Sequence, residues 1–139
     1  MPLKDDLEVF RACRRACLDA VRRALDDDGP TLDDAQIGVL LDGAEVCETT
    51  IRFRRRNSTL HPRMCAACVE ICERCAELCQ TFAADPVMCV CGEACRRCAD
   101  VCRQLTGAGS AGTPHPRRSP LPWRDAADDE PSQARRASA

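Results

Sequence analysis

Cysteine occupies the positions of a heptad seam between Met64 and Leu105, and this pattern constrains the fold more than any other feature. Ten of the thirteen cysteines lie here, in two short blocks separated by Ala84-Asp85-Pro86. Steps of three and four residues alternate within the blocks, through Cys65, Cys68, Cys72, Cys75 and Cys79 and then through Cys91, Cys95, Cys98 and Cys102. This spacing places the thiols on one face of a helix that packs against other helices. A seam that is usually built from Leu and Ile is here built from Cys.

Apolar periodicity along the chain predicts four helices, over about residues 3–27, 32–56, 60–83 and 86–106. Thr31 with Asp34 resembles a capping box for the second helix, Thr59 is the expected N-cap of the third, and Asp85 that of the fourth. Pro62 and Pro86 suit the first turns of the last two helices. Helices of about 20 to 25 residues joined by short loops predict an all-α fold, an antiparallel up-down four-helix bundle.

Composition changes abruptly after this region. Residues 1–106 are predicted to form one domain with a Cys-lined core, and residues 107–139, rich in Pro, Gly, Arg and Asp, to form a disordered tail. The apolar island Leu121-Pro122-Trp123 is a candidate docking peptide for another protein, although an unselected, solvated tail explains it more simply.

Charge and composition exclude several classes of function. A net charge of -2 and an aromatic content of 3% give no basic or stacking surface for nucleic acid. The N-terminus has no export signal and no run approaches 18 apolar residues, so we expect a cytoplasmic protein that does not enter a membrane. Thiols stay reduced in the cytoplasm, which favours metal binding or catalysis over a disulfide framework. Two histidines far apart in the chain do not form a catalytic site with a nucleophile, so we do not expect an enzyme.

The spacing of the cysteines favours monovalent copper. Residues four apart on a helix have Cβ atoms about 5–6 Å apart, which is too far for a disulfide. Linear two-coordinate Cu(I) needs two sulfurs about 4.5 Å apart, and thiolate is the ligand class that Cu(I) selects. One Cu(I) per thiolate also leaves a neutral core, whereas four thiolates around zinc leave a net negative charge. Five Cys-x-x-x-Cys pairs suit Cu(I): Cys13/Cys17, Cys68/Cys72, Cys75/Cys79, Cys91/Cys95 and Cys98/Cys102.

The two blocks read Cys65-Ala-Ala-Cys-Val-Glu-Ile-Cys-Glu-Arg-Cys-Ala-Glu-Leu-Cys79 and Cys91-Gly-Glu-Ala-Cys-Arg-Arg-Cys-Ala-Asp-Val-Cys102. They resemble the cytosolic four-helix-bundle copper storage proteins over about residues 3–106. The resemblance implies a tetramer that binds and stores or buffers many Cu(I) ions, with a copper donor or acceptor as partner. It also implies a set of core ligands, to which we add Cys47, the one cysteine of the second helix: Cys13, Cys17, Cys65, Cys68, Cys72, Cys75, Cys79, Cys91, Cys95, Cys98 and Cys102.

The chain departs from that family in its first two helices, which supply three cysteines. Seam positions there are held by Ala20, Ala24, Ala44 and Ile51, so we expect copper to lie mostly against the third and fourth helices. In an antiparallel bundle we expect Cys13 level with Cys65 and Cys102, and Cys17 and Cys47 near Cys72 and Cys95. Cys89 lies about 200° around the helix from Cys91 and is left out of the ligand set.

Several assignments remain open from sequence. Met64 and Met88 suit core packing, with a copper relay as the alternative, and His61 is expected to be a solvated loop residue rather than an entry ligand. The alternative functions are an iron–sulfur or thiol-redox protein, and a zinc or heavy-metal buffer. The cysteines lack a ferredoxin spacing and a thioredoxin-like context, which weighs against the first of these.

Overall fold

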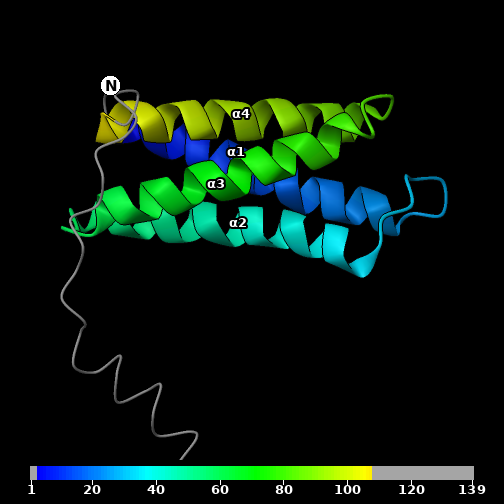
Figure 1. Ribbon diagram of the computed structural model, residues 1–139, viewed down its shortest axis with the longest axis horizontal. Coiled ribbons are helices and arrows are strands. Elements are labelled where there is room, and N and C mark those ends of the chain that lie inside the picture. The colour runs from blue at the N-terminus through cyan, green and yellow to red at the C-terminus, as the bar shows by residue number, and fades with distance from the viewer. Residues whose placement is uncertain (1–2, 108–139) are drawn as a thin grey trace, which may run out of the picture.

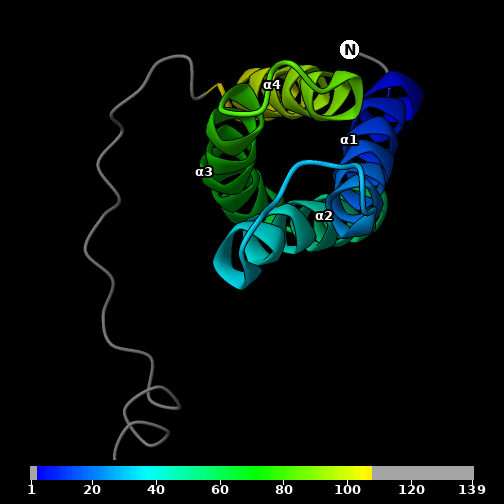
Figure 2. The ribbon, with the colours of Figure 1, turned by 90° about the vertical axis from the view of Figure 1, so that its right-hand side faces the viewer.

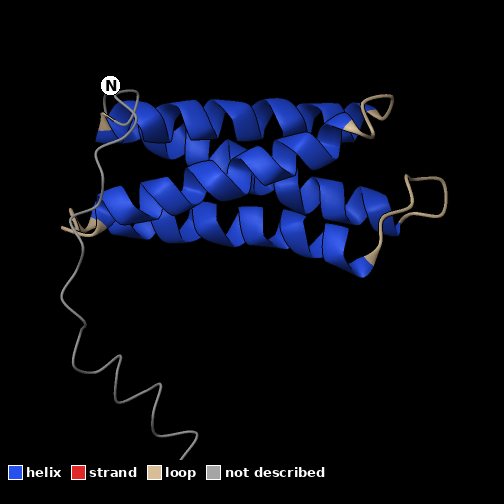
Figure 3. Ribbon diagram, in the orientation of Figure 1, coloured by secondary structure: helices blue, strands red, loops and turns tan. Residues whose placement is uncertain are grey.

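The computed structural model describes residues 3–107, and these form four α-helices with no strand among them (Figure 3). The helices are α1 (Leu3–Leu25), α2 (Asp34–Arg55), α3 (His61–Gln80) and α4 (Pro86–Thr106). The predicted all-α fold is confirmed, whereas the predicted disordered tail lies outside the described residues, apart from Gly107. Within residues 3–107, no helix combines the length and the apolar character needed to cross a membrane.

The ends of α4 are set by the capping signals expected from the sequence. The Asp85 carboxylate accepts hydrogen bonds from the backbone N–H groups of Val87 and Met88, at 3.0 and 3.2 Å. Pro86 takes the first helical position, where a missing N–H costs nothing. At the other end Gly107 adopts a φ of 63°, in the left-handed region that glycine tolerates without steric cost.

The predicted caps of α2 and α3 are wrong. Asp33 caps α2: its carboxylate accepts from the Gln36 N–H at 2.8 Å, and the Gln36 side chain accepts from the Asp33 N–H at 2.9 Å. This reciprocal pair makes the capping box that we expected from Thr31 and Asp34, and α2 therefore begins later. Leu60 precedes α3 without a side-chain cap, in place of the expected Thr59.

Successive helices run in opposite directions around a common axis (Figures 1 and 2). Viewed along the bundle, the helices occupy four corners in chain order, so α4 closes against α1 (Figure 2). Asp6, near the start of α1, pairs with Arg54, near the end of α2, at 2.7 Å. Arg23, near the end of α1, pairs with Asp85 at the start of α4, at 2.8 Å. Both pairs require antiparallel neighbours, in agreement with the predicted up-down topology.

Candidate metal centre

The twelve cysteines of the predicted ligand set all lie in the core. None is more than 1% exposed, whereas Cys89 is exposed. All thirteen are free thiols. The heptad spacing explains this arrangement, because each step of three or four residues returns a side chain to the same helix face. The fold therefore brings the predicted residues together, while their ligation of a metal stays a prediction.

Sulfur atoms contact one another across helices. The Sγ atom of Cys95 on α4 lies 3.7 Å from the Sγ atoms of both Cys13 and Cys17 on α1. The closest contact between different helices joins the Sγ atoms of Cys68 on α3 and Cys98 on α4, at 3.5 Å. Other such contacts are Cys13–Cys72 at 3.9 Å, Cys47–Cys98 at 3.8 Å and Cys17–Cys91 at 3.9 Å. All four helices thus contribute to one connected sulfur network.

The shortest sulfur–sulfur contact within a helix is longer than the shortest contact between helices. Among the five predicted Cys-x-x-x-Cys pairs, Cys68–Cys72 has its sulfurs 3.7 Å apart and Cys91–Cys95 has them 4.0 Å apart. Such pairs can be predicted from the sequence because the spacing along one helix can be read from residue numbers. Side chains that converge on one axis from four helices meet equally closely, so the possible metal-bridging pairs include many that join different helices.

The predicted position of Cys13 along the bundle axis is wrong. Its Sγ atom meets Cys72 and Cys95 rather than Cys65 and Cys102. Helix α1 begins at Leu3 and α3 begins at His61, at the same end of the bundle (Figure 1). Residues equally far from that end are level, since each residue adds about 1.5 Å along either helix. Cys13 therefore lies level with Cys72, about three turns into α3, whereas Cys65 lies within the first turns of that helix.

Hydrogen bonds and burial move the pKa values of neighbouring thiols apart. Hydrogen bonds with Cys102 and then Cys47 lower the pKa of Cys68 to about 6. The pKa of Cys102 is raised above its ordinary 9.0 by hydrogen bonds with Cys65 and Cys68 and by burial. A thiolate in such a core is stabilised when its neighbours donate S–H bonds to it, and those neighbours keep their protons. Hydrogen bonding between the thiols therefore favours ionisation of Cys68 and opposes ionisation of Cys102.

His61 lies at one end of the sulfur network. It is the first residue of α3 and only 9% exposed, and its Nε2 atom lies 3.3 Å from the Sγ atom of Cys65, one helical turn later. Desolvation, together with the charge of Arg54, lowers the pKa of His61. The expectation of a solvated loop histidine is wrong, because His61 is the first residue of α3 and its side chain is buried.

The two methionines differ in their surroundings. Met88 on α4 is fully buried and is one of the largest side chains in the core. Met64 on α3 is half-buried and packs against the core from its edge. Both side chains therefore pack in or against the core, as expected, and a thioether fills irregular space between helices well.

A glycine on α2 makes room for two of the sulfurs. A Cβ atom at Gly43 would lie 2.7 Å from the Sγ atom of Cys75 and 3.0 Å from that of Cys17. The Cys75 thiol also donates to the backbone carbonyl oxygen of Val39, at 3.2 Å. Neither feature was predicted from the sequence. A glycine inside a helix, which costs about 1 kcal/mol relative to alanine, was the available signal.

Three groups of sulfurs within residues 3–107 are close enough to bind a metal ion together, and each has all its sulfurs within 4.8 Å of one another. The groups are Cys13/Cys47/Cys72/Cys98, Cys13/Cys17/Cys95 and Cys68/Cys98/Cys102. Donors of this kind are soft, and such sites favour Cu(I), zinc or iron–sulfur clusters over hard ions such as magnesium or calcium. The first group shares Cys13 with the second and Cys98 with the third. The three groups therefore form one continuous set of potential metal ligands.

Comparison with known proteins agrees with this chemistry. The chain matches the family described as Csp, copper storage protein, over residues 2–107. No curated protein matches the chain. The resemblance found in the two cysteine blocks is therefore confirmed over most of the chain, including all four helices and all thirteen cysteines. On this evidence the protein belongs to the copper storage protein family.

Proposed function

We propose that the protein stores or buffers several Cu(I) ions as thiolate complexes inside the bundle. The observation that carries the proposal is the connected network of buried sulfurs, with contacts of 3.5 to 4.0 Å supplied by all four helices. Sulfurs that must separate to about 4.5 Å for linear copper need to move only slightly. Each Cu(I) cancels the charge of one thiolate, so many ions can enter without leaving a large buried charge.

Family membership supports copper as the metal and storage as the role. The proposed ligands are the twelve buried cysteines, from Cys13 to Cys102, without Cys89. Cysteines that bridge two copper ions allow about one ion per thiol, because each sulfur has more than one lone pair to donate. The function is reversible binding, and we propose no catalysed reaction.

Anaerobic titration tests this proposal. Reduced, metal-free protein is loaded with Cu(I) against a chelator of known affinity, and bound copper and free thiols are counted per chain. We expect about ten or more copper ions per chain, with thiols lost in parallel, if one ion binds per bridging thiolate. Saturation at one or two ions contradicts storage, and a brown iron–sulfur absorption in the purified protein supports the iron–sulfur alternative instead.

The cellular setting is part of the proposal. A chain with thirteen cysteines at helical spacings suits a reducing compartment, and we therefore propose a cytoplasmic location. By family resemblance we propose a homotetramer that exchanges copper with a protein donor or acceptor. Light scattering of the metal-free and loaded protein measures the oligomeric state directly.

A further inference from the structure

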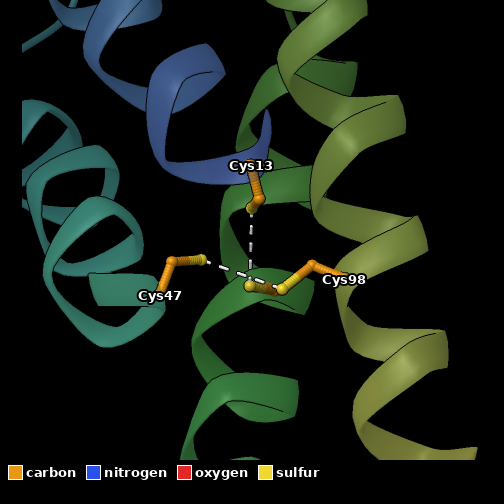
Figure 4. A group of neighbouring side chains, drawn as sticks. Cys13, Cys47 and Cys98 are labelled. Atoms are coloured by element: carbon orange, nitrogen blue, oxygen red, sulfur yellow. Dashed lines mark hydrogen bonds between the residues drawn. The ribbon is translucent and has the colours of Figure 1, made fainter. Parts of the chain in front are cut away.

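Four sulfur atoms near the middle of the bundle form a group unlike the others in residues 3–107. Cys13, Cys47, Cys72 and Cys98 come one from each helix, and their Sγ atoms all lie within 4.8 Å of one another. The remaining two groups contain three sulfurs each. Figure 4 shows Cys13, Cys47 and Cys98 pointing toward a common point from α1, α2 and α4. All four side chains are fully buried.

The spacing of this four-sulfur group fits a single tetrahedral ion. Four thiolates bound to zinc at about 2.3 Å form a tetrahedron with edges of about 3.8 Å. Two opposite edges already have this length: Cys13–Cys72 is 3.9 Å and Cys47–Cys98 is 3.8 Å. Since the other four edges do not exceed 4.8 Å, none must shorten by more than about 1 Å. A linear Cu(I) ion between the sulfurs of either of these two pairs would instead require them to separate to about 4.5 Å.

Neighbouring thiols offset the negative charge of such a site. Four thiolates around one divalent ion carry a net charge of -2, which is costly in a dry core without hydrogen bonds. The Sγ atom of Cys68 lies 3.7 Å from that of Cys72 and 3.5 Å from that of Cys98, and the Sγ atom of Cys95 lies 3.7 Å from that of Cys13. Once the four ligands are thiolates, their negative charge favours the protonated forms of Cys68 and Cys95, which can then donate S–H bonds to three of the four ligands, as groups around metal sites commonly do.

We propose that, in the copper-free protein, Cys13, Cys47, Cys72 and Cys98 bind one tetrahedral, thiophilic divalent ion such as zinc. The site explains the position of Cys47, the only cysteine of α2. A cysteine elsewhere on that helix would leave the ion with three ligands instead of four. An ion held by all four helices also ties them together before copper is loaded. This inference does not depend on copper storage, since it concerns the protein without copper.

Titration with Co²⁺ tests the site, because a cobalt ion in a tetrahedral thiolate site gives visible d–d bands and a near-ultraviolet charge-transfer band. We expect the reduced, metal-free full chain to bind one Co²⁺ with these bands, and one equivalent of Zn²⁺ to remove them. Cys47→Ser should weaken this binding by more than the about 10–100-fold typical of second-shell changes. Cys79→Ser is the matched control, since Cys79 is also buried but lies outside the four-sulfur group, and it should keep the spectrum.

Three results would overturn the inference: native protein without tetrahedral cobalt bands, an unchanged spectrum in Cys47→Ser, or an equal loss in Cys79→Ser. Circular dichroism checks that each variant folds, and Cys47→Ala replaces Cys47→Ser if a buried hydroxyl unfolds the core. Copper counted on the same preparations reports on storage separately. A protein that binds many Cu(I) ions but no Co²⁺ keeps the proposed function and loses this site.

Discussion

Gly43 shows how a single missing side chain controls the sulfur network. At this position on α2 a Cβ atom would lie 2.7 Å from the Sγ atom of Cys75 and 3.0 Å from that of Cys17. In Gly43→Ala the gain in helix propensity, about 1 kcal/mol, is therefore opposed by an overpacking cost of about 1–3 kcal/mol. We expect a net loss of stability in urea unfolding, and fewer Cu(I) ions per chain because both sulfurs are displaced.

Gly38 provides the control on the same helix. A Cβ atom there would meet nothing within 4 Å. Gly38→Ala should therefore stabilise the protein by about 0.5–1 kcal/mol through helix propensity alone, with an unchanged copper count. Equal stability and equal copper binding in the two variants would show that the close approach at Gly43 has no consequence.

At the scale of elements, Asp85 joins two helices. Its carboxylate caps α4 and also accepts a hydrogen bond from the Arg23 Nε of α1, at 2.8 Å. The hydrogen bond with Arg23 is the main cause of its pKa falling below the ordinary 3.8. Because the folded-state pKa is lowered, the charged form stabilises the fold above about pH 4, and this stabilisation disappears as the pH falls through the folded-state value.

Asp85→Asn separates these two roles, since asparagine is also a good N-cap but carries no charge. We expect a lower Tm than wild type at about pH 7, and convergence of the two Tm values in acid, where wild-type Asp85 is also neutral. Arg23→Gln is the matched control and should show the same pH dependence. A Tm difference that persists unchanged into acid would mean that the ion pair with Arg23 does not stabilise the bundle.

For the whole molecule, copper loading should be coupled to proton release. The pKa of Cys79 is raised by its hydrogen bond with Cys91 and by burial, and that of Cys102 by its hydrogen bond with Cys65. Such thiols must lose a proton to bind metal. Hydrogen bonds lower the pKa of Cys68 and Cys75 to about 6, so these two release little at neutral pH. Acid should therefore weaken loading, by up to about tenfold per pH unit for each proton released.

Proton release can be measured in weakly buffered, anaerobic protein with a pH indicator during Cu(I) addition. We expect somewhat less than one proton per copper ion near pH 7, rising toward one at lower pH as more of the thiols start protonated. Chelator competition at several pH values gives the matching change in affinity. Loading without proton release would show that the metal-free core is already fully ionised, against the effect of burial on its thiols.

Residues that depend on local spacing were predictable, and residues that depend on packing between helices were not. The heptad seam predicted the helices and the buried cysteines, and Asp85 with Pro86 predicted the start of α4. His61 was misplaced because its burial depends on how the start of α3 packs against other helices, which bring Asp6 and Arg54 near it. The level of Cys13 was misplaced because it depends on how α1 and α3 align at their shared end.

The sequence alone determined which cysteines face inward, because periodicity along one helix is a local property, and the chemistry of sulfur led to the prediction of a soft metal. Only the tertiary structure decided which sulfurs meet. Cys47 joins Cys13, Cys72 and Cys98 because four helices, each with its own start and its own rotation about its axis, bring those four atoms within 4.8 Å of one another. No spacing along the chain records that convergence, since it is set by the loops and by the volumes of the side chains packed between the helices.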